Sequence, residues 1–284
     1  MKKLWRFFFL IFSILINLFI YNPIFSFDKP LQTADSNALR LAIDNAVNLK
    51  DPTEKFLALQ SIAEKNVASN ISNFMITDLL HTALVATTKE TELSKKSDIL
   101  RKSLLEVLVV LTFKPKMEAP VPSGFPEPTP LGVVEFKKLP IYRMAKVSSS
   151  TSNTSFFTLF NHIKKNDIAM TAPVEMTMVE KNGKYAESSM AFLYKETSLG
   201  KTGTQDSIQV LDTSESLVVC VGMQGSPNSK AIETATKWLN EKLKSKPGEY
   251  EIVGELKVMG YNSPFMPDKL KYYEVMLPIK SIKK

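Results

Sequence analysis

The side chains that most often carry metal or nucleophilic chemistry are scarce in this 284-residue chain. It has one cysteine, Cys220, and two histidines, His81 and His162. A single cysteine excludes an intramolecular disulfide, and the three residues are too few for a zinc ribbon, an iron–sulfur cluster or an all-histidine metal site. The phosphate-binding patterns GxGxxG and GxxxxGK[ST] are both absent from the sequence. Chemistry at a metal or a nucleotide therefore has little support.

Carboxylates are the remaining candidates for acid–base chemistry. Glu175 with either Glu187 or Glu274 could form a carboxylate pair inside a barrel. Glu175 alternates with apolar neighbours, so we expect it to face solvent. A Ser–His–Asp site would need one of the two histidines, and no GxSxG motif supports it. His81 lies off the apolar stripe of its helix and His162 at the flank of another, so we expect both to be exposed.

Glycine and proline divide the chain into two unlike parts. All ten glycines lie at or after Gly124, and residues 31–114 contain one proline, Pro52. Apolar residues in that first part recur at helical spacing, which predicts three to four helices between about 34 and 113. Residues 115–130 contain six prolines. They are expected to form a semi-rigid linker, or a strap on a surface, between two domains.

Residues 131–280 change to the alternation of β-strands. The pattern reads strand, strand, helix, strand, strand, and then repeats in the same order. We therefore predict an α+β fold in which about eight antiparallel strands and two helices form a pseudo-twofold barrel. Helices that cross a curved sheet usually leave a cleft, where small molecules bind.

The first 26 residues are expected to be a targeting segment. A basic start is followed by an apolar run over residues 7–21, and Ser26 offers a small residue near a cleavage point. This predicts a secretory signal peptide, with an uncleaved N-terminal anchor over residues 4–21 as the alternative. The protein would then be secreted, periplasmic or luminal. The net charge of +7 is mostly scattered lysine, so we expect no nucleic-acid partner.

Four strings in the second part resemble the SOUL heme-binding protein family. The most specific is IAMTAPV at residues 168–174. The segments 134–136 (VEF) with 140–143 (PIYR) resemble the family's opening hairpin, and residues 157–163 its first helix. Residues 260–265 (GYNSPF) with 273–275 (YEV) resemble its closing motif. The resemblance covers about residues 131–279 and leaves the helical part unassigned.

The resemblance implies a heme or related tetrapyrrole held mainly by apolar contact along the first helix, with basic groups near the propionates. Carried onto this sequence, the implied binding residues are Phe156, Phe160, Ile163, Lys164, Lys165, Met170 and Tyr261. Tyr261 precedes a turn, so it could close the pocket or simply pack.

Three departures from the family pattern alter this expectation. Lys137-Lys138 stands where some members have a histidine, which removes one candidate iron ligand. The loop over residues 164–167 is short, which reshapes the pocket rim. Residues 271–273 read KYY where the family usually has Arg-Arg-Asn.

Three functions remain open. The first is an exported SOUL-type domain that binds heme or another tetrapyrrole in an apolar cleft without strong axial ligation. The second is a small-molecule hydrolase or sensor that uses a carboxylate in the same cleft; distant GyrI-like relatives of the barrel bind or hydrolyse small molecules. The third is an interaction protein whose helical part binds a protein partner. A membrane contact is expected only through the N-terminal segment.

Overall fold

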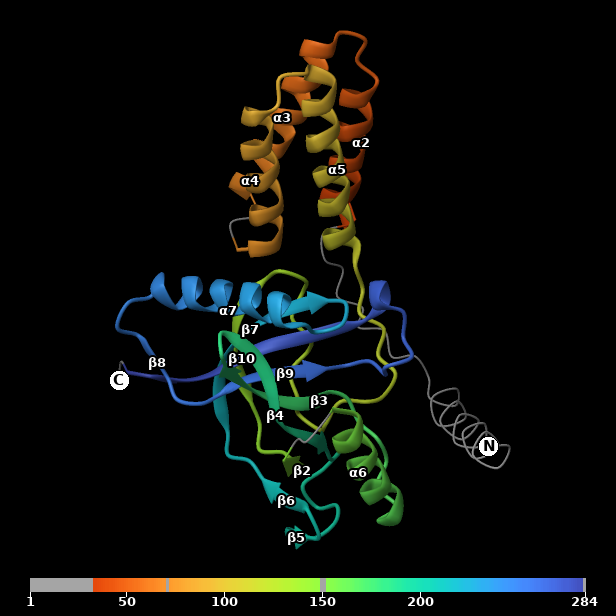
Figure 1. Cartoon of the computed structure of the whole chain (residues 1–284), viewed down its shortest axis with the longest axis vertical. Coiled ribbons are helices and arrows are strands. Elements are labelled where there is room, and N and C mark those ends of the chain that lie inside the picture. Colours follow the sequence, from red (N-terminus) through yellow and green to blue (C-terminus); the bar gives the residue numbers. More distant parts are fainter. Residues whose placement is uncertain (1–32, 70–71, 149–151, 283–284) are drawn as a thin grey trace, which may run out of the picture.

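The computed structural model describes residues 33–69, 72–148 and 152–282 (Figure 1). The targeting segment expected over residues 1–26 lies outside these residues. In the described part, none of the helices is both long and apolar enough to cross a membrane.

The first domain is a bundle of four helices that stands above the rest of the molecule (Figure 1). The helices are α2 (Thr33–Val47), α3 (Pro52–Ser69), α4 (Phe74–Lys89) and α5 (Leu93–Thr112). Helix α3 begins at its proline, and the Asp51 side chain accepts a hydrogen bond from the Glu54 backbone N–H at 2.8 Å, as an N-cap does. All four helices supply fully buried apolar side chains to one core. The helical N-terminal part is thus confirmed.

The second domain is built on one antiparallel sheet. Its strands are β1 (Val134–Leu139), β2 (Arg143–Ser148), β3 (Val174–Lys181), β4 (Lys184–Leu193), β5 (Gly203–Gln205), β6 (Ile208–Asp212), β7 (Ser216–Gln224), β8 (Tyr250–Ile252), β9 (Leu256–Gly260) and β10 (Tyr272–Ser281). The two helices of this domain are α6 (Ser152–Lys165) and α7 (Ser229–Lys244), and a short 3-10 helix, η1, spans Asp268–Leu270.

Eight strands were expected, and the described sheet has ten. The two additional ones, β5 and β8, are three residues long. The expected strand over residues 250–261 is divided into β8 and β9. Along the sheet the order is β1-β7-β10-β9-β3-β4-β2-β6-β5, with β8 paired to β10, so the described strands form an open path and not a closed ring.

The strand order shows how the two repeats fit together. Unit one (β1, β2, α6, β3, β4) and unit two (β6, β7, α7, β9, β10) have the same element order. The path β1-β7-β10-β9 mirrors β6-β2-β4-β3 about the β9–β3 pair. The first strand of each unit pairs with the other unit, β1 with β7 and β6 with β2. The two units therefore exchange their first strands.

Both faces of the sheet are covered, by different parts of the chain. On β7, Val219 and Val221 belong to the core beneath α7, whereas Val218 and Cys220 belong to the core on the opposite face. Helices α6 and α7 cover the first face. The opposite face is covered by the proline-rich segment, residues 115–130, which we call the strap. Cys220 is fully buried on the strap side.

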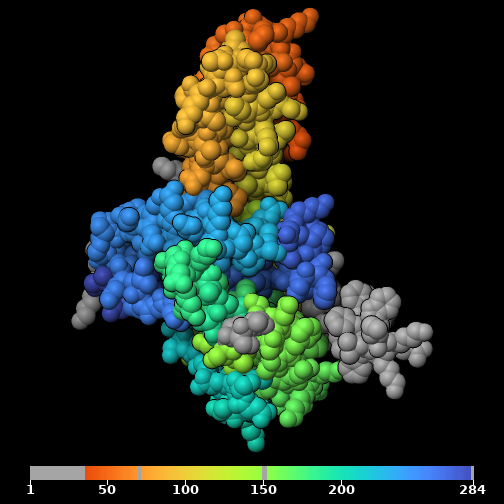
Figure 2. All heavy atoms as spheres, in the orientation of Figure 1, coloured from red at the N-terminus to blue at the C-terminus, as the bar shows by residue number. Residues whose placement is uncertain are grey.

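The helical bundle rests on α7 (Figures 1 and 2). The Trp238 indole N–H of α7 donates to Asp78 Oδ2 of α4 at 2.7 Å. The backbone N–H of Phe74 donates to the Gly132 carbonyl at 2.8 Å. Gly132 has φ +69°, and a Cβ there would lie 2.3 Å from Met75 Cβ, so only glycine fits this junction.

Candidate functional site

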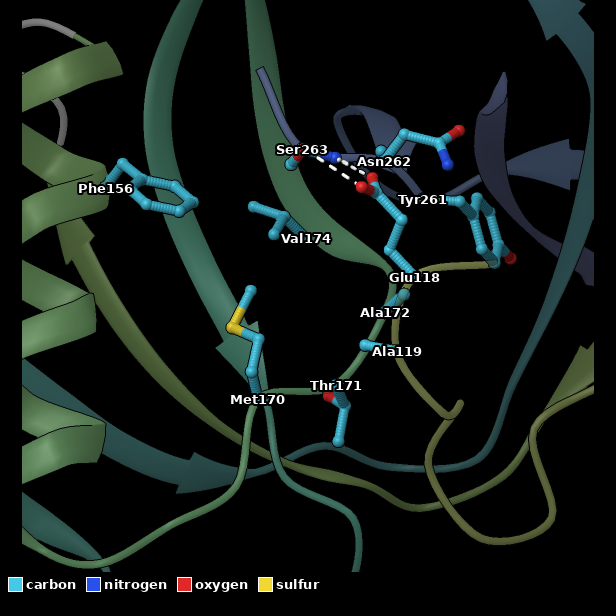
Figure 3. Close-up of a pocket in the computed structure, with 11 residues that line it drawn as sticks. Glu118, Ala119, Phe156, Met170, Thr171, Ala172, Val174, Tyr261, Asn262 and Ser263 are labelled. Atoms are coloured by element: carbon cyan, nitrogen blue, oxygen red, sulfur yellow. Dashed lines mark hydrogen bonds between the residues drawn. The ribbon is translucent and has the colours of Figure 1, made fainter. Parts of the chain in front are cut away.

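A hollow lies where the beginning of α6, the segment 170–174, the segment 260–263 and the strap meet (Figure 3). It holds about 310 Å³ of empty space, part of which is open to solvent. Three of these four walls come from the strings 168–174 and 260–265 and from the helix singled out in the sequence. The fourth wall, Glu118 and Ala119, comes from the proline-rich segment, which was expected to be a linker or a strap on a surface and not part of a site.

The hollow has an apolar side and a polar side. Phe156, Met170 and Val174 form the apolar side (Figure 3). Opposite them, Glu118 Oε2 accepts a hydrogen bond from the Ser263 backbone N–H at 2.6 Å, and Glu118 Oε1 accepts one from the Ser263 hydroxyl at 3.2 Å. The arrangement suits a ligand with a flat apolar edge.

Packing fixes the aromatic wall. The Phe156 and Phe160 rings are stacked, with centroids 6.3 Å apart and planes 10° apart. Phe156 also meets Phe192 of β4 edge-on at 5.1 Å. Such aromatic pairs stabilise their geometry by about 0.5–1.5 kcal/mol each beyond the area they bury. Phe156 is thus a positioned side chain.

The structure divides the seven sequence-predicted residues among three places. Phe156, Met170 and Tyr261 line the hollow. Phe160 and Ile163 pack in the core between α6 and the sheet. Lys164 and Lys165 are exposed at the C-terminal end of α6. Their roles in binding remain predictions.

Tyr261 borders the hollow, but its hydroxyl is engaged elsewhere. It donates to Glu274 Oε2 at 2.6 Å. Burial, together with the neighbouring Glu274 carboxylate, raises the pKa of Tyr261 well above its ordinary value. A neutral phenol held in this way is a poor iron ligand, so Tyr261 serves as a wall.

The expectation that His162 is exposed was wrong. Its side chain is 7% exposed, and its Nε2 lies 2.8 Å from the Tyr194 hydroxyl, which comes from just beyond β4. Burial and the nearby Lys165 lower the pKa of His162, which favours the neutral ring. His162 is not among the residues that line the hollow. His81 is exposed, as expected.

Glu175 was also expected in solvent, and this expectation was wrong. It is 2% exposed on the strap side of the sheet. Its Oε1 lies 3.0 Å from Lys257 Nζ, and its Oε2 accepts a hydrogen bond from the Tyr142 hydroxyl at 2.8 Å. Burial and the Glu175 carboxylate raise the pKa of Tyr142.

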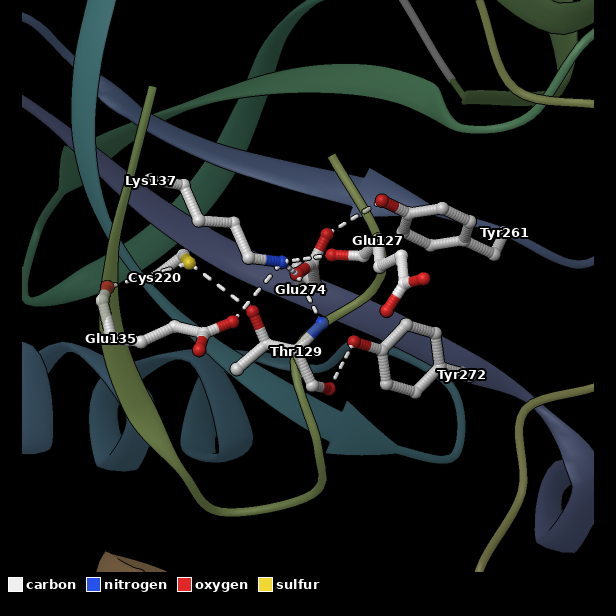
Figure 4. Close-up of polar contacts among 8 residues, drawn as sticks. All are labelled: Glu127, Thr129, Glu135, Lys137, Cys220, Tyr261, Tyr272 and Glu274. Carbon is white, nitrogen blue, oxygen red and sulfur yellow. Dashed lines mark hydrogen bonds and ion pairs between the residues drawn. The ribbon is translucent and has the colours of Figure 1, made fainter. Parts of the chain in front are cut away.

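Glu274 has a separate network, which also contains a lysine and a tyrosine (Figure 4). It is 1% exposed and lies 2.8 Å from Lys137 Nζ. It accepts further hydrogen bonds from the Thr129 backbone N–H at 2.8 Å and from Tyr261. Burial alone would lower the pKa of Lys137, but the Glu274 carboxylate beside it raises that pKa above its ordinary value.

The carboxylate pairs considered from the sequence are therefore not supported. Glu175 and Glu274 each have their own lysine and tyrosine. Glu187 accepts a hydrogen bond from Ser152 at 2.7 Å on the exposed side of α6. Within the described residues, no group of three or more histidine, cysteine, aspartate or glutamate side chains could hold a metal ion.

The comparison with family models concerns the second part of the chain. A family model described as SOUL heme-binding protein matches residues 132–278. No match was found among curated proteins.

Several solved structures resemble the same part of the chain at low identity. A hydrolase from Listeria innocua has a TM-score of 0.42 at 11% identity over 54% of this chain and 94% of its own. The C-terminal domain of EcmrR has a TM-score of 0.39 at 13% identity over 52% and 96%. A putative transcription regulation protein from Staphylococcus aureus has a TM-score of 0.30 at 10% identity over 52% and 97%.

Proposed function

Because this chain belongs to the SOUL heme-binding protein family, we propose that its sheet domain binds heme or a related tetrapyrrole at the hollow beside α6. The observation that carries the proposal is the apolar wall of Phe156, Met170 and Val174, which lies within the family match. Apolar burial supplies most of the binding free energy for a flat macrocycle.

The size of the hollow limits how the ligand lies. Ligand pockets span roughly 300–1,000 Å³. The enclosed part of the hollow is only about 30 Å³, and the 310 Å³ includes space open to solvent, so a tetrapyrrole would lie against the apolar wall with one edge and not enter the hollow. The rest would extend along α6, where Phe157 is 47% exposed. Lys164 lies eight residues beyond Phe156, about 12 Å along the helix axis. We therefore propose that the two exposed end lysines pair with the propionates.

Iron ligation is a minor part of the proposal. Histidine, cysteine, methionine and tyrosine are the usual protein ligands of heme iron. Of the residues that line the hollow, Met170 and Tyr261 are of these types, and the Tyr261 hydroxyl is already bound to Glu274. We therefore propose apolar binding with weak axial ligation, if any, from Met170.

We also propose that the protein is exported by residues 1–26, as a secreted, periplasmic or luminal protein. The N-terminal residue of the protein recovered from its native compartment would decide between a cleaved signal and an anchor. The carboxylate-based hydrolase has no observation in its favour, because both buried carboxylates are paired with lysine.

A hemin titration of the full chain, followed through the Soret band, tests the binding proposal. We expect a saturable shift at one equivalent. Phe156→Asp should weaken binding by at least about tenfold, because it places a charge in the apolar wall.

Asn48→Asp is the control. It adds the same charge at an exposed position of the helical bundle, away from α6 and the hollow, and should leave hemin affinity unchanged. A linear response that neither substitution alters would mean nonspecific partitioning and would remove heme as the ligand.

A further inference from the structure

The hollow is small because the strap closes one side of it. Glu118 and Ala119 of the strap are wall residues. Ala119, Ala172 and Tyr261 also belong to the core beneath the strap, so the hollow borders directly on that core. The strap therefore separates the hollow from a larger apolar surface.

That surface is the face of the sheet opposite the helices. Met117 and Phe125 of the strap are buried against it. The sheet contributes apolar side chains from several strands, among them Leu139, Met144, Leu193 and Met259. The Phe125 ring meets the Tyr142 ring edge-on at 5.6 Å. Without the strap, an apolar face large enough for a flat macrocycle would continue from the hollow.

The strap is attached in a way that lets it leave without breaking the sheet. It forms none of the strands of the described sheet, and six of its sixteen positions are proline, which has no backbone N–H. Its described polar contacts run largely through side chains: Glu274 accepts from the Thr129 N–H, Lys137 donates to the Glu127 carbonyl, and Tyr272 donates to the Thr129 carbonyl (Figure 4).

Backbone contacts hold the strap at a few further points. The Ser123 N–H donates to the Lys195 carbonyl at 2.8 Å, and the Ala172 N–H donates to the Pro120 carbonyl at 2.9 Å. Segments with few ladder hydrogen bonds open locally at a lower free-energy cost than the strands beside them. The hydrogen bonding of the strap therefore permits it to open as one unit, and the cost of opening is the release of its buried side chains, chiefly Met117 and Phe125, from the sheet face.

We propose that the strap is the gate of the ligand site and that the face beneath it, around Phe125 and Tyr142, is the deep part of that site. The proposal rests on the tetrapyrrole function and extends it. The closed strap seen here is the resting state. A tetrapyrrole binds the open state, so its apparent affinity is reduced by the fraction of molecules that are open.

The single cysteine allows a direct test. Thr129 Oγ1 of the strap lies 3.2 Å from Cys220 Sγ of β7. In the Thr129→Cys variant, the two sulfurs would need to approach by about 1 Å to reach the disulfide length of ~2.05 Å. Oxidation would then lock the strap to the sheet, and reduction would release it in the same sample. Wild type has one cysteine, so it cannot form this bond and controls for the oxidant.

Hemin association is measured by stopped flow on the reduced and oxidised variant. The reduced form should resemble wild type, and the oxidised form should bind hemin at least about tenfold more slowly. Equal hemin association rates in the reduced and oxidised variant would contradict the gate proposal but not the proposed binding function.

Hydrogen exchange gives a readout that needs no ligand. The amides of Ser123, Phe125 and Thr129 should exchange together, faster than those of β7, and oxidation of the variant should suppress this exchange. If the amides of the strap and of β7 exchange only by global unfolding, the gate proposal is contradicted, whether or not the protein binds hemin. If the strap opens but wild type binds no hemin, the tetrapyrrole function fails and the opening stands.

A second variant covers failure of the disulfide to form. Phe125→Ala removes the largest strap side chain from the sheet face and should speed hemin association. Leu239→Ala removes a buried side chain beneath α7 instead and should leave association unchanged. Equal rates in these two variants would also count against the gate.

Discussion

Unit one and unit two of the sheet domain share one element order but present different outer surfaces. Helix α7 of unit two is covered by the helical bundle through Trp238 and Asp78. Helix α6 of unit one carries an exposed Phe157 and borders the hollow. A repeated fold offers two related surfaces, and here the additional domain occupies one of them. The α6 surface of unit one is not covered in this way, and it is where we propose that the ligand binds.

The two buried carboxylates show a second difference between the units. Glu175 of unit one is paired with Lys257, which is 22% exposed. Glu274 of unit two is paired with Lys137, which is 8% exposed. In each case the lysine comes from the opposite unit, so each pair joins the two repeats. The burial of the lysine should determine how much the removal of each glutamate lowers the free energy of unfolding.

We expect the largest effect from removing Glu274. Glu274→Ala should lower the free energy of unfolding by about 3–5 kcal/mol, because it leaves the Lys137 charge buried and unpaired. Glu175→Ala should cost less, about 1–3 kcal/mol, since Lys257 can still reach water. Urea denaturation of both variants measures the difference.

A double variant separates the charge from the packing. Glu274→Leu with Lys137→Met should recover only the part of the loss that is due to the unpaired charge, because the Thr129 N–H and the Tyr261 hydroxyl still lose their acceptor. Equal destabilisation by the two single alanine variants would contradict the role given to lysine burial.

A smaller effect is expected at the contact between the bundle and α7. Asp78→Ala leaves the buried Trp238 N–H without its acceptor and should cost about 1–2 kcal/mol. Asp44→Ala, on an exposed position of the same bundle, is the control and should be neutral. Urea denaturation measures the stability, and hemin affinity should not change in either variant. A loss of hemin affinity in Asp78→Ala would mean that the contact between the bundle and α7 affects ligand binding beside α6.

The smallest effect is expected from the lysines at the helix ends. Alanine at both Lys164 and Lys165 should weaken hemin binding about two- to fivefold at low salt, because exposed charge pairs contribute only about 0.2–1 kcal/mol. The same change at Lys242 and Lys244, in the last turn of α7, should have no effect. The difference should shrink as ionic strength rises. Equal losses in the two double variants would show a general charge effect.

Periodicity predicted the elements well because it reports which face of each element is buried. The helical first part, the repeated order and the buried Cys220 follow from it. It failed at Glu175 for a specific reason. Glu175 alternates with apolar neighbours, so periodicity predicts that its side of the strand faces solvent. The strap covers that side of the sheet, and Glu175 is therefore buried. The prediction for His162 failed for a different reason: its partner Tyr194 lies 32 residues away, so local periodicity does not report the contact.

Only part of the candidate site could be predicted from the sequence. The wall residues Met170 and Tyr261 lie in strings that resemble the SOUL family, and Phe156 directly precedes the string 157–163, so the sequence pointed to them. Glu118 carries no such signal, because a proline-rich segment is usually read as a connection. The alternation of buried Met117 and Ala119 around it is the one local hint.

The exchange of first strands between the units has a consequence for synthesis on the ribosome. Strand β1 pairs with β7, which is made only after the whole of unit one has emerged. Unit one therefore cannot complete its sheet during translation, and β1 must wait with an unpaired edge. Such an edge is open to pairing with the wrong chain.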